Sequence, residues 1–168
     1  MNSAGSPSEW LDLFESLVPD ILDLVVCSWA GMNVPPDSLE DEITERLCRL
    51  LRLNKNLSRL PFQIHVQLVE LDPAADQDQG RMDIVFIPLT PSEDIYFCLE
   101  CKRLNVIKEG RLRTYASEYV SHGMLRFVQG RYAKAVRHGG MLGYVLDGQL
   151  ARAIESIGVA VQGKHVEL

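Results

Sequence analysis

The sequence has no apolar run of the roughly 18 residues that a membrane-spanning helix needs; the longest candidate, LVVCSWAGMNV at 24–34, is too short. Its N-terminus has no basic stretch followed by an apolar one, so we expect no secretory signal and a cytoplasmic protein that binds no membrane. The sequence also has neither a GxSxG nucleophile motif nor a Walker-type phosphate loop. These absences argue against membrane proteins, serine hydrolases of that type and P-loop NTPases.

The four cysteines do not predict a metal site. Without an export signal they are expected to be reduced thiols. Cys98 and Cys101 have CxxC spacing, but side chains of a strand alternate between its two faces, so these two thiols should point apart. No second CxxC or HxxxH completes a zinc site. Cys27 and Cys48 are interpreted as small core residues.

Charge is distributed unevenly along the chain. Residues 1–45 contain ten of the 23 acidic residues and none of the 17 Lys and Arg. Residues 102–137, by contrast, contain nine Lys and Arg against two acidic residues. A nucleic-acid backbone needs a local basic surface rather than a basic protein, so the net charge of −6 does not exclude such a ligand. A solvated helix face is the alternative interpretation of the basic segment.

The apolar patterning predicts helices followed by a meander of strands. Pro19 interrupts the first helical pattern, which predicts two short helices or one kinked helix. Ser38, with Asp41 three residues on, resembles a weak capping box. Gly123 could break the long helix that follows the strands. The expected elements are helix 9–31, helix 39–53, strands 62–71, 81–89 and 95–104, loop 105–113, helix 114–138, strand 139–148, helix 149–158 and a tail that is an edge strand or free.

The stretch IYFCLECKRL at 95–104 reads as a buried strand that nevertheless carries Glu100 and Lys102 on one face. A short turn pairs this strand with the preceding one, which can bring Asp83 beside Glu100. Two carboxylates held together repel each other, and a divalent cation with oxygen ligands relieves that repulsion. The backbone carbonyl of Cys101 is a further candidate ligand. Lys102 could stabilise hydroxide or the developing charge on a phosphate.

Asp83, followed by Glu100-Cys101-Lys102 on the next strand, resembles the D…(D/E)xK signature of the PD-(D/E)xK nuclease superfamily. Met82 rather than Pro precedes Asp83, as is frequent in that superfamily. The resemblance covers residues 39–147 and implies a restriction-endonuclease-like αβββαβ core, with a mixed central sheet flanked by helices. An extra N-terminal helical segment would precede it, so we expect an acidic arm at 1–36 and a nuclease-like domain at 37–168.

The resemblance also implies further site residues. Such nucleases often recruit an acidic residue from the first helix, where Glu42 lies nearer the apolar stripe than Glu45; an exposed acid that favours the helix dipole is the alternative. Glu70, near the end of its strand, is another candidate metal ligand. On the helix after the third strand, Gln129 and Tyr132 have QxxY spacing where superfamily members typically have QxxxY.

We expect nucleic-acid contacts from the basic segment that begins at Lys102. Arginine presents a fork suited to phosphate oxygens. The expected contact residues are Arg103, Arg126, Gln129, Arg131 and Tyr132.

Three hypotheses follow. The first is a Mg²⁺- or Mn²⁺-dependent nuclease acting on DNA, with RNA left open, in a prokaryotic defence or repair assembly. The second is a catalytically silent scaffold subunit of the same fold, whose acidic arm docks a protein partner or a second copy. The third is a structural domain in which Glu100 and Lys102 form an ion pair.

Overall fold

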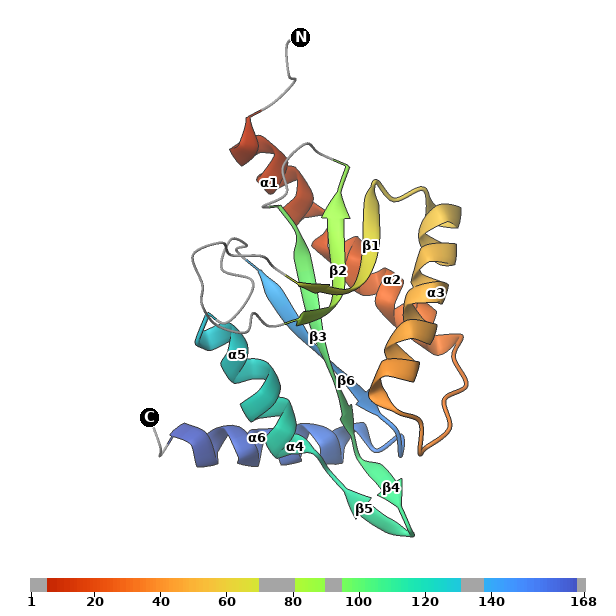
Figure 1. Cartoon of the computed structure of the whole chain (residues 1–168), viewed down its shortest axis with the longest axis vertical. Helices are drawn as coiled ribbons and strands as arrows, with labels where there is room; N and C mark the ends of the chain where they lie inside the picture. The colour runs from red at the N-terminus through yellow and green to blue at the C-terminus, as the bar shows by residue number, and fades with distance from the viewer. Residues whose placement is uncertain (1–5, 70–80, 90–94, 131–137, 166–168) are drawn as a thin grey trace.

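The computed structural model describes residues 6–69, 81–89, 95–130 and 138–165 (Figure 1). Two short helices and a long one precede three strands, a small hairpin, a composite helix, one more strand and a final helix. In chain order these are α1 (Pro7–Ser16), α2 (Val18–Ala30), α3 (Glu40–Ser58), β1 (Phe62–Val69), β2 (Arg81–Pro88), β3 (Phe97–Leu104), β4 (Val106–Lys108), β5 (Arg111–Arg113), α4 (Ala116–Tyr119), a π-helical turn (Val120–Met124), α5 (Leu125–Val128), β6 (Gly139–Val145) and α6 (Leu150–His165).

The central sheet has four strands in the order β1-β2-β3-β6. β1 and β2 are antiparallel, as are β2 and β3, whereas β6 runs parallel to β3 along its full length. A parallel neighbour requires a crossover connection, and the segment from β4 to α5 supplies it. The chain is therefore a mixed α/β protein with a mixed four-stranded sheet flanked by helices, which confirms the fold class at this level.

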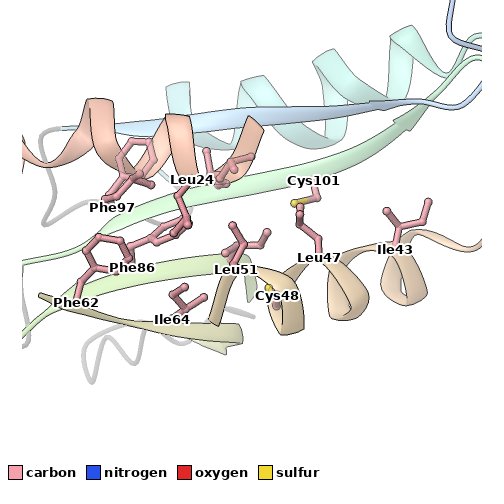
Figure 2. Close-up of a cluster of buried hydrophobic side chains, with 14 of the residues drawn as sticks. Leu24, Ile43, Leu47, Cys48, Leu51, Phe62, Ile64, Phe86, Phe97 and Cys101 are labelled. Carbon is pink, nitrogen blue, oxygen red and sulfur yellow. The ribbon is translucent and has the colours of Figure 1, made fainter. Parts of the chain in front are cut away.

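Alternation along β3 separates the two faces of the sheet. Leu99 and Cys101 join the main hydrophobic core with side chains of α2 and α3, as Figure 2 shows for Leu24, Leu47 and Cys101. Cys98 points the other way, into a smaller cluster that Phe127 of α5 contacts. The two thiols of the CxxC pair therefore lie on opposite faces, as the strand period predicts.

The acidic N-terminal segment is packed into the protein. Leu17 ends α1 and precedes α2, with Pro19 in the first turn of α2, so two helices form rather than one kinked helix. Phe14 and Ile21 are buried in the same core as β3, and Trp29 stacks on Tyr144 with ring centroids 5.3 Å apart. The described residues of the segment 6–36 thus pack their apolar side chains into the core of the protein.

Four local predictions were wrong. Cys27, interpreted as a core residue, is exposed, whereas Cys48 is buried as expected. Residues 105–113, expected as a loop, form the β4–β5 hairpin. The tail, expected as an edge strand or free, continues α6 to His165. The N-cap of α3 is Leu39 rather than Ser38, because the Glu42 carboxylate accepts a hydrogen bond from the Leu39 N–H at 3.2 Å. Within the described ranges, no helix is both long and apolar enough to cross a membrane.

Candidate functional site

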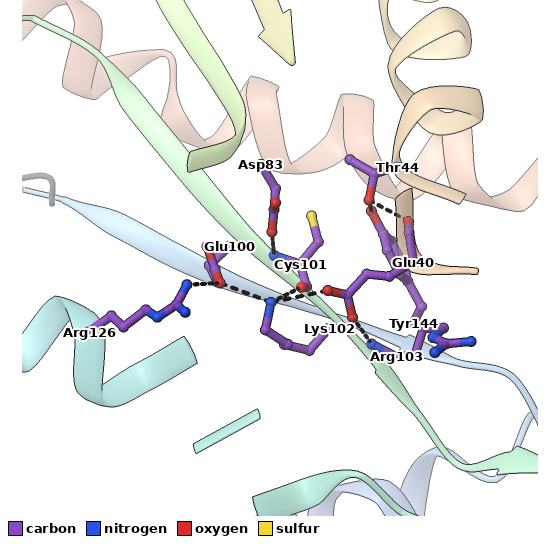
Figure 3. A network of polar contacts seen from close by, with 9 residues as sticks. All are labelled: Glu40, Thr44, Asp83, Glu100, Cys101, Lys102, Arg103, Arg126 and Tyr144. Atoms are coloured by element: carbon purple, nitrogen blue, oxygen red, sulfur yellow. Dashed lines mark hydrogen bonds and ion pairs between the residues drawn. The ribbon is translucent and has the colours of Figure 1, made fainter. Parts of the chain in front are cut away.

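The candidate site lies where β2 and β3 separate. Their pairing runs from Phe86↔Phe97 to Ile84↔Leu99 and stops there. Beyond this point β3 keeps its pairing with β6, but its edge facing β2 is no longer covered by a strand. Backbone groups on that edge need other partners. Side chains of α3, β2 and β3 itself provide these partners, and Figure 3 shows them converging around Cys101.

Asp83 occupies the first position after the separation. Its carboxylate accepts a hydrogen bond of 2.7 Å from the Cys101 N–H, which replaces the missing ladder bond. On the other side, the β1–β2 pairing omits the Gln67–Asp83 position, where Gln67 has a φ of 56°. A left-handed non-glycine residue inside a strand is unusual and is found most often near functional sites. Asp83 is therefore a carboxylate placed at an irregular point of the sheet.

The protonation of Asp83 is shifted by its surroundings. Burial, and after it the negative charge of Glu100, raise the pKa of Asp83 to about 6, although the hydrogen bond from Cys101 acts in the opposite direction. The shift has the sign expected for two neighbouring carboxylates in a poorly solvated place. Such a pair has a negative potential that a cation would relieve.

Glu100 is the most deeply buried acid of the site, with 2% of its side chain exposed. Its Oε1 lies 2.9 Å from Lys102 Nζ and 3.5 Å from Arg126 Nη1. Its Oε2 is buried and has no hydrogen-bond partner among the described residues. A buried carboxylate oxygen without a partner costs stability, so one acceptor position of this site is left open for a donor or a cation.

Lys102 lies at the centre of the arrangement. Its ammonium contacts Glu100 Oε1, Glu40 Oε1 at 3.1 Å and the carbonyl oxygen of Cys101 at 2.7 Å. Burial lowers the pKa of Lys102, but the carboxylates of Glu100, Glu40 and Asp83 outweigh it, so the net effect raises the pKa. Lys102 therefore remains a cation at neutral pH.

Glu40, the first residue of α3, supplies the acid from the first long helix. Besides contacting Lys102, its Oε2 accepts a hydrogen bond of 2.9 Å from the Arg103 N–H on the open edge of β3. The predicted residue, Glu42, instead caps the helix and is exposed, and Glu45 is exposed beside Arg49. Glu40, rather than Glu42, is thus the acid of α3 that contacts Lys102.

A signal in the sequence could have identified Glu40. The apolar stripe of Ile43, Leu47 and Leu51 is buried. Extended by seven residues from Leu47 toward the N-terminus, it falls on Glu40, because seven residues are nearly two helical turns. Of Glu42 and Glu45, the two acids compared from the sequence, Glu42 lies nearer the stripe, but Glu40 lies nearer still.

Buried polar contacts fix the start of α3 against the sheet. The Thr44 hydroxyl donates to the Glu40 carbonyl at 2.9 Å and lies 3.0 Å from the Tyr144 hydroxyl of β6. Burial raises the pKa of Tyr144 far above its ordinary range, so the phenol stays neutral. Sequence reasoning missed both residues, because a single Thr on a helix and a single Tyr on a strand carry no pattern.

On the opposite face, a π-helical turn covers Glu100. A Cβ placed at Gly123 would overlap the Met141 side chain and lie 3.8 Å from Glu100 Cγ. Glycine therefore lets this turn approach the sheet closely. Arg126 follows on α5 and reaches back to Glu100. Inserted π-helical turns are rare and are frequently found at functional sites.

The predicted nucleic-acid residues have different positions. Arg103 donates from Nη1 to the Ser38 carbonyl at 2.8 Å and lies over the Tyr115 ring, so its guanidinium is engaged within the protein. Gln129 is exposed at the end of α5. Glu70, Arg131 and Tyr132 lie outside the described residues.

The oxygen atoms of this site suit a hard divalent cation, which prefers carboxylate and carbonyl ligands. Asp83, Glu100, Glu40 and the Cys101 carbonyl supply such oxygens, and the unpartnered Glu100 Oε2 is a ready acceptor. As they are arranged, however, the Lys102 ammonium holds three of these oxygens. Among the described residues, no group of three or more His, Cys, Asp or Glu is set to hold a metal ion.

Comparison with known proteins adds no family. No family model, no curated protein and no solved structure matches this chain. The functional argument therefore rests on the residues and their geometry.

Proposed function

We propose that this protein is a divalent-metal-dependent nuclease of the PD-(D/E)xK type, with a restriction-endonuclease-like fold, that hydrolyses phosphodiester bonds of DNA. The observation that supports this is the convergence of Asp83, Glu100, Glu40 and Lys102 at the point where β2 and β3 separate. The four residues come from three different elements. Three acids and one lysine around an uncovered strand edge are an unusual feature for a hydrophobic sheet to maintain.

Asp83, Glu100, Glu40 and the carbonyl of Cys101 would hold the metal. When bound, Mg²⁺ or Mn²⁺ would supply Lewis-acid stabilisation of the charge that develops on the phosphate. Burial, and after it the neighbouring charge of Glu100, raise the pKa of Asp83 to about 6, which is a cost that a bound cation would relieve. Above that pH the site is fully anionic at Asp83 and attracts a cation most strongly.

The raised pKa of Lys102 and its contacts with Glu100 and Glu40 support a role in charge stabilisation. A lysine that stays protonated cannot act as a general base, but it can stabilise negative charge on a nucleophile or on a phosphate oxygen. Arg126 is one-third exposed and lies at the Glu100 carboxylate, so it can turn toward a phosphate without leaving the site. Lys102 would thus act at the reacting atoms and Arg126 at the bound strand.

A direct test uses linear and circular plasmid DNA with purified protein in Mg²⁺, Mn²⁺ or EDTA. The variant Glu40→Gln should lose metal-dependent cleavage. Glu45→Gln, which removes an exposed acid from the same helix, should retain it. Cleavage that persists in EDTA, or that both variants retain equally, would contradict the proposal.

One observation favours a second function, a catalytically silent binding or scaffold module. Most polar groups of the site already have partners: Lys102 contacts two acids, Arg126 lies at one of them, and Asp83 and Glu40 each accept a backbone N–H. A polar network of this kind can be purely structural. In that case the folded protein would neither cleave DNA nor gain stability from divalent cations.

A further inference from the structure

The β4–β5 hairpin is a two-stranded ribbon that extends beyond the end of the central sheet (Figure 1). Its turn is Glu109–Gly110, with φ values of 53° and 71°. Positive φ at both central residues is typical of a type I′ turn, whose twist matches that of the two strands. The ribbon is therefore a regular element with a defined pairing, and its two faces can be assigned.

One face of the ribbon is basic. Lys108 is paired with Arg111, and Val106 with Arg113, so these side chains share a face. Ile107 and Leu112 form the pair between them and point to the other face. The face therefore carries three cations beside a buried Val106.

This charge arrangement does not serve the stability of the fold. Like charges directly opposite each other on neighbouring strands are destabilising, and Lys108 and Arg111 are such a pair. Within the described part of the chain, no carboxylate forms an ion pair with Lys108, Arg111 or Arg113. A local basic surface on a protein of net charge −6 is best explained by an anion from outside.

The base of the ribbon is fixed to the strand that carries the site. Asn105 is fully buried, with a φ of 53°, and turns the chain from β3 into β4. Its N–H donates to the Thr114 carbonyl at 3.2 Å, which closes the ribbon, and its side-chain amide donates to Asp147 at 3.0 Å. At about 3.3 Å per residue, Lys108 lies no more than about 26 Å along the chain from Glu100. Because this distance is shorter than one turn of B-DNA, about 34–36 Å, the ribbon and the site lie within reach of the same duplex.

We propose that the β4–β5 ribbon is a second DNA-contacting element, which lays Lys108, Arg111 and Arg113 into the major groove of a duplex and onto its phosphates. The major groove of B-DNA accommodates a two-stranded β-ribbon, whereas that of A-form RNA is too deep and narrow to be read in this way. Single-strand binders use aromatic side chains for base stacking, and the ribbon has none. Duplex DNA is therefore the ligand that the shape and composition of the ribbon fit.

The inference rests on the proposed function, since it concerns the same substrate, but it is tested by binding alone. Fluorescence anisotropy would follow a labelled duplex of about three helical turns, in EDTA, over about 0.05–0.3 M salt. Arg111→Gln/Arg113→Gln is the test variant. Arg49→Gln/Arg59→Gln removes two exposed arginines on α3 and at its end, away from the ribbon, and is the matched control.

We expect the ribbon variant to lower the slope of log affinity against log salt by about two, since each phosphate contact contributes about 0.9. At about 0.1 M salt this corresponds to an affinity about 60-fold weaker. The control should bind like the unmodified chain. The variant should also be at least as resistant to urea, because substitution of Arg111 removes a like-charge pair. Glu109→Gln, which removes the acid at the tip, should tighten binding.

The assignment would be overturned if the ribbon variant and the control lost the same affinity for duplex DNA, or if the ribbon variant lost the same affinity for single-stranded DNA as for the duplex. It would also be overturned if the unmodified protein bound no duplex. The two proposals can fail separately. Plasmid cleavage by a chain whose ribbon variant binds normally contradicts only this inference. Ribbon-dependent binding without any metal-dependent cleavage contradicts only the nuclease.

Discussion

Asp83→Asn should make the metal-free protein more stable at neutral pH, although it removes a proposed catalytic ligand. Asparagine has nearly the same shape, and its carbonyl can still accept the hydrogen bond that the Cys101 N–H donates to Asp83. The substitution removes a charge that is poorly solvated and lies near Glu100. A site residue that costs stability is expected where function requires close charges.

The magnitude follows from the pKa of Asp83. A rise from 3.8 to about 6 corresponds to about 3 kcal/mol, at about 1.4 kcal/mol for each pKa unit. Because the pKa is higher in the folded state, the ionised carboxylate destabilises the folded protein. This cost is complete above about pH 6, decreases as the pH falls from there, and is absent below the unfolded value near 3.8. The advantage of the variant should therefore be about 3 kcal/mol at pH 8 and close to zero at pH 4.

Urea unfolding in EDTA at the two pH values measures this difference. Asp41→Asn, which changes an exposed acid in the first turn of α3, is the control and should not stabilise the protein. Mg²⁺ at 100 times its Kd should then stabilise the unmodified chain by about 2.7 kcal/mol and the Asp83→Asn variant far less. A variant that is no more stable at pH 8, or equally stabilised at both pH values, would refute the electrostatic reasoning.

Three further substitutions test the surroundings of the site by urea unfolding. Lys102→Met should cost about 3 kcal/mol in EDTA, because it leaves the buried Glu100 carboxylate without its nearest cation; a loss below about 1 kcal/mol would contradict the ion-pair assignment. Tyr144→Phe should cost about 1 kcal/mol, the value of one buried hydrogen bond, and an unchanged midpoint would argue against that bond. Gly123→Val should cost about 1–3 kcal/mol through overpacking against the Met141 side chain, and a neutral result would show that the end of Met141 or the π-helical turn can move away.

Several elements could be predicted because their causes are local in sequence. Alternation of polar and apolar residues predicts β1, and the three- and four-residue spacing of apolar residues from Ile43 onward predicts α3. Pro19 marks the boundary between α1 and α2. The opposite orientation of Cys98 and Cys101 follows from the strand period alone. Asp83, Glu100 and Lys102 could be selected because charged residues inside apolar strands are conspicuous.

The hairpin at 105–113 was not predicted because its signal is weak. Its strands have three residues each, too few to show alternation, and Glu-Gly is a less specific turn than Asn-Gly or Asp-Gly. The continuation of α6 through Gly158 and Gly163 was missed for a related reason. Glycine costs a helix about 1 kcal/mol, a preference that the surrounding structure can override.

The sequence by itself determined which residues are apolar, most of the longer strands and helices they form, and that one acid and one lysine share a face of β3. The tertiary structure decided which of the acids on α3 reaches them, because that depends on how the helix is positioned over the point where β2 and β3 separate. It also decided that the Lys102 ammonium contacts Glu100, Glu40 and the Cys101 carbonyl. Contacts between residues about 60 positions apart depend on the packing of whole elements, and no local pattern encodes them.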